Sequence, residues 1–250
     1  MSVSFRNVET TLGNVKILKG ANLDAEDGRL TGIVGPNGSG KSTLIKTLFA
    51  LAGLDAGSVW IDGINIKNLN RKQLARRVGY VGQEMNCAFD FSVREVVSMG
   101  RFPHTRKERT RGNHEDVVEE ALMVLQIREF ADRSILTLSG GEKKMAFLAR
   151  AIAQGVNTIV LDEPTNHLDI KHQLFILDYL KSSGKTILLV IHDLALAVRY
   201  CDTLYLLYGG RTVAHGTPET VLTRANVWNV FGVNGAVSRE AGGRRTFSLD

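Results

Sequence analysis

The run GPNGSGKST at residues 35–43 constrains this chain more than any other segment, because it matches the phosphate-loop pattern G-x-x-x-x-G-K-[ST]. It follows an apolar stretch at residues 30–34 (LTGIV), and a helical pattern begins at Lys41. In such a loop, backbone N–H groups and the N-terminus of the new helix surround an anion. Lys41 is expected to reach the β- and γ-phosphates and Ser42 to ligate Mg²⁺. The predicted nucleotide-binding residues are Gly35, Pro36, Asn37, Gly38, Ser39, Gly40, Lys41, Ser42 and Thr43.

The composition is that of a globular protein, since 44% of the 250 residues are hydrophobic and 23% are charged. The net charge of +5 argues by itself neither for nor against nucleic acid, and no nucleic-acid partner is expected. Two cysteines, Cys87 and Cys201, are too few for a disulfide framework or a zinc cluster and are expected to be small apolar fillers. The N-terminus lacks a signal-peptide core, and the longest apolar stretch, residues 187–191, is too short to span a membrane.

Short β-branched runs alternate with helical patterns, which predicts an α/β core. Residues 57–63 alternate like an antiparallel strand, whereas 156–162 and 185–191 are typical of central parallel strands. A hairpin with a Gly209-Gly210 turn is expected to join residues 203–208 to 211–214. We expect one domain with its core at 1–84 and 156–217, a helical insertion at 85–155 and an extension at 218–250 that ends irregularly.

The helical insertion is predicted from helical spacing at residues 93–99, 114–125 and 143–153. In the last of these, Met145, Leu148, Ala149 and Ile152 recur at i, i+3, i+4 and i+7, so this helix is expected to bury one face.

Two acidic residues, Asp162 and Glu163, follow the apolar run at residues 158–161. A carboxylate at the end of such a strand can hold Mg²⁺ beside a phosphate loop, and the adjacent Glu163 can polarise an attacking water. Alone, such a pair is more often a helix cap or a solvated turn. The phosphate loop earlier in the chain favours the catalytic interpretation.

A second small-residue turn, LSGGE at residues 138–142, opens the helix that follows it. Ser139 can cap this helix, whose N-terminus can face an anion. One subunit does not need two phosphate loops for one phosphate. A two-fold dimer accounts for both, with each nucleotide between one phosphate loop and the partner's 138–142 turn.

Together these motifs resemble the nucleotide-binding subunit of an ATP-binding cassette (ABC) transporter, in the family's order. GPNGSGKST resembles the Walker A loop, Gln83 in YVGQ the Q-loop glutamine, and LSGGE the signature. TIVLDEP resembles Walker B, residues 166–169 (NHLD) the D-loop, and His192 the switch histidine. The resemblance implies an α/β P-loop NTPase fold with a RecA-like core, an antiparallel β subdomain and a helical insertion.

The family mechanism, carried onto these residues, implies an ATPase with Glu163 as general base and His192 at the γ-phosphate. Its cofactors are ATP and Mg²⁺. Gln83 senses the metal and water site, so the implied metal ligands are Ser42, Gln83 and Asp162. In a homodimer, Asp169 contacts the opposite subunit, and the signature completes the site across the interface through Ser139, Gly140 and Gly141.

Two positions depart from the family pattern. Leu12 stands where the family usually places an aromatic residue against adenine, and Val15 lies nearby, so apolar packing is expected to replace stacking. After LSGGE the family often has R-Q-R, whereas this chain has Lys143, Lys144 and Met145. Positive charge is thus kept near the signature helix.

The segment FSVREVVSMGRFPH at residues 91–104 resembles importer ATPases for ferric siderophores, haem and cobalamin, as does the segment from residue 214 to about 233. This implies a peripheral subunit on the cytoplasmic membrane face, with transmembrane permease partners and an extracytoplasmic binding protein. The alternative is a soluble ABC ATPase of iron–sulfur cluster assembly, against which the GRFPH segment argues. The basic segment RFPHTRKERTR at 101–111 is either a solvated loop or a surface facing lipid headgroups or the permease.

Overall fold

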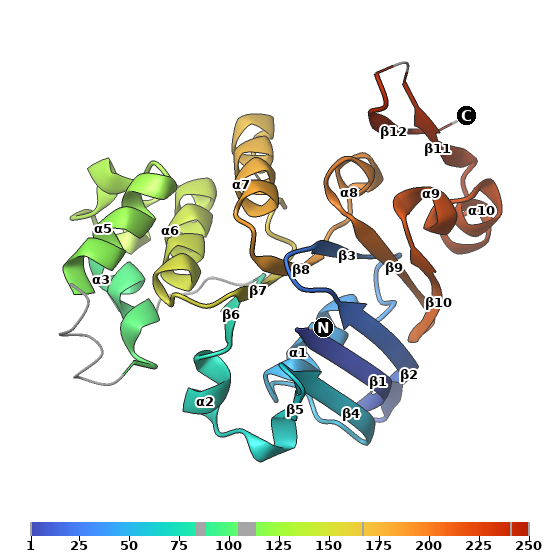
Figure 1. Ribbon diagram of the computed structural model, residues 1–250, viewed down its shortest axis with the longest axis horizontal. Coiled ribbons are helices and arrows are strands. Elements are labelled where there is room, and N and C mark those ends of the chain that lie inside the picture. The colour runs from blue at the N-terminus through green and yellow to red at the C-terminus, as the bar shows by residue number, and fades with distance from the viewer. Residues whose placement is uncertain (1, 84–88, 105–113, 167, 241, 250) are drawn as a thin grey trace. The chain divides into compact units, whose positions relative to one another are not determined.

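The computed structural model describes residues 2–83, 89–104, 114–166, 168–240 and 242–249. The chain divides into two compact units, shown in Figure 1. The first comprises Met1–Leu69 and Leu177–Asp250, and the second comprises Asn70–Ile176. The subdomain limits expected from the sequence stay a prediction.

An antiparallel sheet of order β2-β1-β4-β5 opens the first unit. Along β1 the side chains alternate: Val3 and Phe5 are fully buried, whereas Arg6 is exposed. This alternation gives the sheet one core face and one solvent face. The pairing of residues 56–61 confirms the antiparallel strand expected at 57–63. The strands are β1 (Val3–Leu12), β2 (Val15–Ala25), β4 (Ala56–Ile61) and β5 (Ile64–Asn65), followed by η1 (Ile66–Asn68).

A second run of strands in the same unit has the order β10-β9-β3-β8. β3 pairs in parallel with both β8 and β9, and every residue of β3 and β8 is buried. Burial on both faces is why these strands are continuous apolar runs in the sequence. The expected Gly209-Gly210 hairpin is confirmed, since Tyr208 pairs with Arg211. The strands are β3 (Leu30–Val34), β8 (Thr186–Val190), β9 (Thr203–Tyr208) and β10 (Arg211–Gly216).

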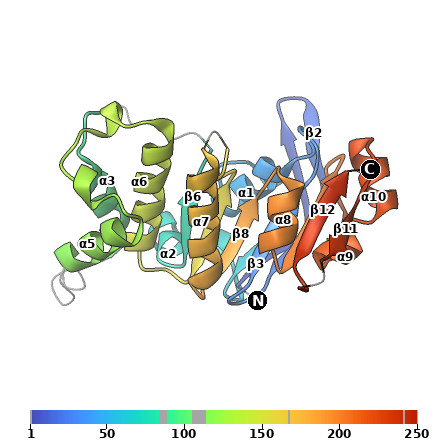
Figure 2. The same cartoon turned by 90° about the horizontal axis from the view of Figure 1, so that it is seen from above.

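The end of the chain forms a two-stranded hairpin, so the expectation of an irregular end was wrong. Arg239 forms an ion pair with Glu219 at 2.6 Å, and Arg245 donates to the Cys201 carbonyl at 2.9 Å. These tertiary contacts hold both strands, which is why the local sequence pattern did not reveal them. In Figures 1 and 2 the hairpin lies beside α10. The helices and strands here are α8 (Leu194–Tyr200), α9 (Pro218–Val221), α10 (Arg224–Phe231), β11 (Gly235–Arg239) and β12 (Arg245–Leu249).

The second unit combines the parallel strands β6 and β7 with a group of helices. Helices α3, α5 and α6 pack against one another and lie side by side in both views (Figures 1 and 2). Helix α7 (Ile170–Ser182) crosses the limit between the units. The other elements are α2 (Arg71–Ala75), β6 (Val78–Val81), α3 (Val93–Ser98), η2 (Met99–Arg101), α5 (His114–Val124), η3 (Arg128–Phe130), η4 (Ile135–Thr137), α6 (Gly140–Ala153) and β7 (Thr158–Asp162).

Helix α6 is buried on more than the one face that its spacing predicted. All residues from 144 to 149 are buried, including Lys144, whereas Ile152 of the predicted face is only half-buried. The physical reason is that α6 packs against α3 and α5 and also against β6. A helix enclosed in this way loses the polar face that a surface helix keeps.

Cys201 is fully buried and lies against β3, where a Cβ on Gly32 would come within 2.6 Å of its Sγ. Burial raises the pKa of its thiol to about 12, so it behaves as the apolar filler that the sequence predicted. Cys87 lies outside the described residues. Within the described ranges, no helix is both long and apolar enough to cross a membrane.

The Gly209-Gly210 turn gives a matched test of this packing. Both glycines have positive φ, but a Cβ on Gly210 would lie 2.1 Å from the Ile17 carbonyl oxygen, whereas one on Gly209 meets nothing within 4 Å. We expect Gly209→Ala to lower the free energy of unfolding by about 1 kcal/mol through backbone strain alone. Gly210→Ala should lower the free energy of unfolding by about 1–3 kcal/mol more than Gly209→Ala does, because β2 must move away from the new Cβ. Urea titration of both variants measures this difference, and equal losses would contradict the packing argument.

Candidate functional site

Two glycines of the loop between β3 and α1 (Lys41–Leu48) lie so close to neighbouring elements that a side chain there would force movement. A Cβ on Gly35 would lie 2.1 Å from the Leu207 carbonyl oxygen, and one on Gly40 would lie 2.7 Å from Leu18 Cδ2. Both residues have positive φ, at 150° and 102°. The backbone therefore turns closely enough to surround a small anion.

Lys41 and Ser39 give this loop the polarity of an anion site. Lys41 is only 4% exposed, and its Nζ donates to the carbonyl oxygens of Gly35 and Pro36, both at 2.9 Å. The Ser39 hydroxyl is buried and has no hydrogen-bond partner in the described part of the chain. Gly40 is the N-cap residue of helix α1 and supplies no side-chain cap to the start of this helix. These groups fit a phosphate.

His192 lies at the same edge of the first unit as the glycine loop. β3 and β8 are parallel neighbours with Ile33 opposite Val190, and the Ile191 N–H donates to the Ile33 carbonyl at 3.1 Å. Because the carboxyl ends of parallel strands meet at one edge, the loop after β3 and His192 after β8 emerge together. Asp193 accepts from the Leu196 N–H at 2.9 Å, which caps α8 and fixes the backbone beside His192.

In the second unit, Glu163 follows β7 and is held by two amides. Gln83 Nε2 donates to Glu163 Oε2 at 2.9 Å, and Asn166 Nδ2 donates to the same oxygen at 2.5 Å. Glu163 is 8% exposed and has a φ of 55°, an uncommon conformation for a residue other than glycine. Its carboxylate thus has a single orientation, as a group positioned for chemistry needs.

Gln83 reaches Glu163 because β6 and β7 are parallel, with Val81 opposite Leu161. Asp162, the last residue of β7, is fully buried. Burial, together with the Asp162 charge, raises the pKa of Tyr80 to about 12. The carboxylate of Asp162, the amide of Gln83 and the hydroxyl of Ser42 are hard oxygen donors, the chemistry that Mg²⁺ prefers.

The 138–142 turn opens α6 with a complete capping box. The Glu142 N–H donates to Ser139 Oγ at 3.3 Å, and the Ser139 N–H donates to Glu142 Oε2 at 2.7 Å. These bonds lower the pKa of Glu142. Ser139 and Gly140 are exposed, and a Cβ on Gly140 would meet nothing within 4 Å. The predicted cap is confirmed, and the turn presents an open surface.

Asp169 caps the start of α7. Its carboxylate accepts from the His172 N–H at 2.9 Å and lies 2.8 Å from His172 Nδ1, and these bonds lower the pKa of Asp169. The Asp169 side chain is 64% exposed, and its predicted contact with another subunit stays a prediction. His167 of the same motif lies outside the described residues.

Leu12 and Val15 face each other across the turn from β1 to β2. Their exposed fractions are 47% and 62%, so both present apolar surface to solvent. Their predicted contact with adenine stays a prediction.

The GRFPH segment is attached to the end of α6. Arg101 is 8% exposed, and its Nη1 donates to the Ala153 carbonyl at 2.9 Å. His104 Nε2 lies 2.9 Å from the Gln154 carbonyl oxygen. Both side chains therefore satisfy the last carbonyls of the signature helix. The residues of the basic segment from 105 to 111 lie outside the described residues.

Sequence reasoning missed the position of Lys144. This side chain is 6% exposed, and its Nζ donates to the carbonyl oxygens of Glu163 at 2.8 Å and Asn166 at 2.7 Å. Burial lowers the pKa of Lys144 to about 8, and the Glu163 charge opposes this shift. The departure from the family's R-Q-R pattern was the available signal. It could not show that the lysine points inward, because that depends on the enclosure of α6.

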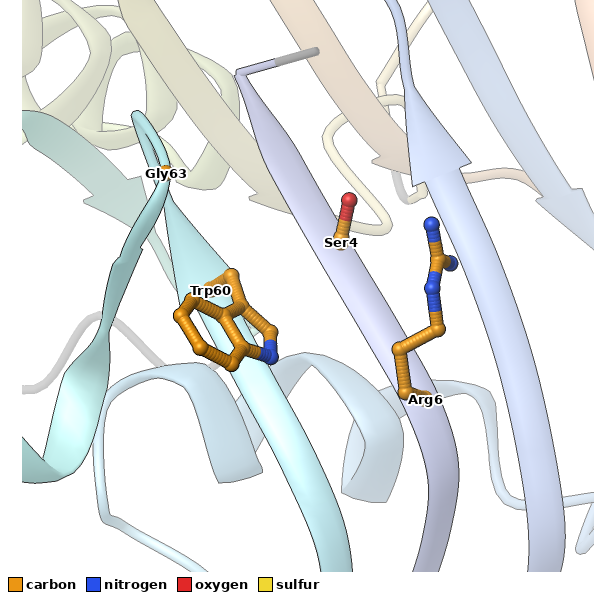
Figure 3. Close-up of a pocket in the computed structure, with 4 residues that line it drawn as sticks. All are labelled: Ser4, Arg6, Trp60 and Gly63. Carbon is orange, nitrogen blue, oxygen red and sulfur yellow. The ribbon is translucent and has the colours of Figure 1, made fainter.

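A separate cavity of about 270 Å³ opens on the antiparallel sheet, lined by Ser4, Arg6, Trp60 and Gly63 (Figure 3). Arg6 is held there by an ion pair with Asp24 at 2.7 Å. The lining of this cavity includes none of the residues that the sequence motifs indicate.

Comparisons with known proteins agree with this geometry. The profile of the ABC transporter family matches residues 18–166. This chain belongs to the ABC transporter family. The cassette is 39% identical over 235 residues to the ferric enterobactin transport ATP-binding protein of Escherichia coli K12, covering 91% of this chain and 87% of that protein. It is 37% identical over 244 residues to a cobalamin import ATP-binding protein of Halobacterium salinarum, covering 96% of this chain.

The cassette spans only 61% of the length of that Halobacterium relative. Among solved structures, it is similar to a dimeric ATP-binding cassette in a post-hydrolysis state with ADP and phosphate bound, at a TM-score of 0.74 and 27% identity. That alignment covers 86% of this chain and 98% of the other. The P-loop ABC fold expected from the motifs is therefore confirmed.

The buried lysine gives a pH-dependent test of the site. The folded cassette releases the Lys144 proton near pH 8, whereas an unfolded chain keeps it to about pH 10.5. Between these values the unfolded state binds more protons, so this group makes the folded state more stable as pH rises. We expect the free energy of unfolding of the wild type, relative to Lys144→Met, to increase by about 2–3 kcal/mol over that range.

Urea titrations at several pH values measure this difference. The control is Lys143→Met, because the Lys143 side chain is more exposed, and its difference from the wild type should stay constant. A pH-independent difference for Lys144→Met would contradict the buried environment.

Proposed function

We propose that this cassette is the ATP-hydrolysing subunit of an importer for an iron–siderophore, haem or cobalamin type substrate. The observation that carries the substrate class is the identity of 39% with a ferric enterobactin transport ATP-binding protein over 91% of the chain. The relative from Halobacterium salinarum, a cobalamin import protein, supports the same class. Both relatives favour import over the alternative of iron–sulfur cluster assembly.

ATP would be bound by residues 35–43, whose buried Ser39 hydroxyl, uncapped helix start and narrow glycine backbone suit a phosphate chain. Lys41 would turn from the loop carbonyls toward the β- and γ-phosphates. Leu12 would contact the adenine. Bound Mg²⁺ would neutralise phosphate charge, with Ser42, Gln83 and Asp162 as its ligands.

Hydrolysis would proceed by in-line attack of water on the γ-phosphate. Glu163 would accept the proton of this water, since its carboxylate already has a fixed direction. His192 would contact the γ-phosphate, while Lys41 stabilises the charge that develops on it.

Two copies of the cassette would form the working ATPase. Ser139, Gly140 and Gly141 would complete the partner's nucleotide site, and Asp169 would contact the opposite subunit. The exposure of Ser139 and Asp169 supports this arrangement, as does the dimeric state of the similar ADP-bound cassette.

In the cell, the dimer would sit on the cytoplasmic face of the membrane as a peripheral subunit. Its partners would be transmembrane permease subunits, supplied by an extracytoplasmic substrate-binding protein. ATP binding would close the dimer, and hydrolysis with phosphate release would reopen it.

Removing the proposed base separates chemistry from binding. We expect Glu163→Gln to lower kcat for ATP hydrolysis by about 10²–10⁴-fold, because the amide cannot accept the proton of water. The dissociation constant for ATP should change by no more than about three-fold, because the phosphate loop is unaltered. Phosphate release and equilibrium nucleotide titration measure the two quantities. The exposed Glu129→Gln is the control and should match the wild type. Unchanged hydrolysis in Glu163→Gln would contradict the proposed mechanism.

Co-purification tests the import function directly. We expect the tagged chain, recovered from gently solubilised membranes, to bring down a multi-spanning permease in equal amount by mass spectrometry. A tagged Lys41→Ala chain should still recover it, because the proposed permease contact does not involve the phosphate loop. If the tagged chain brought down only soluble cluster-assembly proteins, the import function would be excluded. The ATPase proposal would still be decided by the Glu163→Gln experiment.

A further inference from the structure

Helix α6 carries both the signature turn and a buried cation. The signature lies at its first residues, and Lys144 follows within the next turn. Helix α6 packs against α3, α5 and β6, and the Lys144 side chain is buried. A buried ammonium is retained only where it has good acceptors.

Those acceptors are the two ends of the turn that follows β7. Lys144 Nζ donates to the Glu163 carbonyl at 2.8 Å and to the Asn166 carbonyl at 2.7 Å. Asn166 in turn donates through its side chain to Glu163 Oε2 at 2.5 Å. The ammonium, the turn and the Glu163 carboxylate thus form one continuous set of hydrogen bonds.

This turn needs an external restraint. Glu163 has a φ of 55°, which an L-residue adopts only when its surroundings hold it there. Among the described residues, the backbone hydrogen bonds of this segment are long: the Asn166 N–H donates to the Glu163 carbonyl at 3.3 Å, and the Leu168 N–H donates to the Thr165 carbonyl at 3.4 Å. The two shorter bonds from Lys144 converge on the same backbone and fix its direction.

We infer that Lys144 is a positioning residue, which ties the signature helix to the backbone of Glu163 and Asn166 and so makes the direction of the Glu163 carboxylate depend on the position of the signature turn. Engagement of the signature by a partner subunit would then be transmitted to the proposed general base through one side chain. The catalytic consequence of this inference rests on the proposed function. The positioning of the Glu163 backbone by Lys144 does not depend on that function.

The chemistry of the lysine side chain decides which substitutions test this inference. Methionine has a similar length and apolar character but no donor, so Lys144→Met removes one donor from the Glu163 carbonyl and one from the Asn166 carbonyl. Arginine keeps the charge and supplies several donors, so Lys144→Arg restores at least part of the restraint. Lys143→Met is the matched control on the same helix, because Lys143 is more exposed.

The experiment uses the full-length cassette with Mg²⁺ and ATP. We expect Lys144→Met to lower kcat about 10–100-fold, with KM and the dissociation constant for ATP within about three-fold of the wild type. Lys144→Arg should regain at least a third of the decrease in log kcat that Lys144→Met shows. Lys143→Met should have the wild-type kcat.

Hydrogen–deuterium exchange of the nucleotide-free protein tests the positioning without any reaction. Peptides covering residues 160–170 should exchange at least three-fold faster in Lys144→Met than in the wild type, and more slowly again in Lys144→Arg. If Lys144→Met does not fold, Lys144→Leu, which also lacks a donor, takes its place. A wild type that does not hydrolyse ATP would refute the proposed function, while the exchange data would still decide the positioning. Exchange and kcat equal to the wild type in the donor-free variant, or a loss confined to ATP binding, would overturn the inference.

Discussion

The register of neighbouring parallel strands is the constraint on which the rest of this cassette depends. In the first unit, Ile33 lies opposite Val190, so the glycine loop after β3 and His192 after β8 leave one edge together. In the second, Val81 lies opposite Leu161, so Gln83 and Glu163 leave one edge together and form a hydrogen bond. A shift of register in either pair would separate these groups, although every residue of the motifs would remain.

Each group at these edges is then fixed by a different local device. Glycines fix the phosphate loop, because a Cβ at Gly35 or Gly40 would collide with Leu207 or Leu18. An Asx cap fixes the backbone beside His192, and a capping box fixes the signature turn. Glu163 is fixed by side chains from other elements, namely Gln83 after β6 and Lys144 from α6. Rigid supports of this kind are what a phosphate-transfer site requires, since its catalysis consists largely of positioning and charge.

Helix α6 connects several of these devices. Its first turn is the signature, Lys144 near its start holds the Glu163 turn, and Arg101 and His104 bind the carbonyls at its end. The GRFPH segment, through which the sequence resembles metal-chelate importers, therefore has a structural role at the end of this helix. The resemblance in that segment indicates that the helical subdomains are related. Within the segment, the described residues Arg101 and His104 serve to pack it against the end of α6.

The sequence by itself determined the motifs of this protein: the phosphate loop, the acidic pair after β7, the signature turn and the family to which they belong. Short-range patterns suffice for these, because a glycine loop, a capping box and a buried parallel strand each depend on residues that are near in sequence. Only the tertiary structure decided that the chain ends in a hairpin, that α6 is enclosed, and that Lys144 points at the carbonyls of Glu163 and Asn166. The physical reason is that these features arise from contacts between elements far apart in the chain. No local period or motif encodes which neighbour will cover a helix face or accept a buried proton.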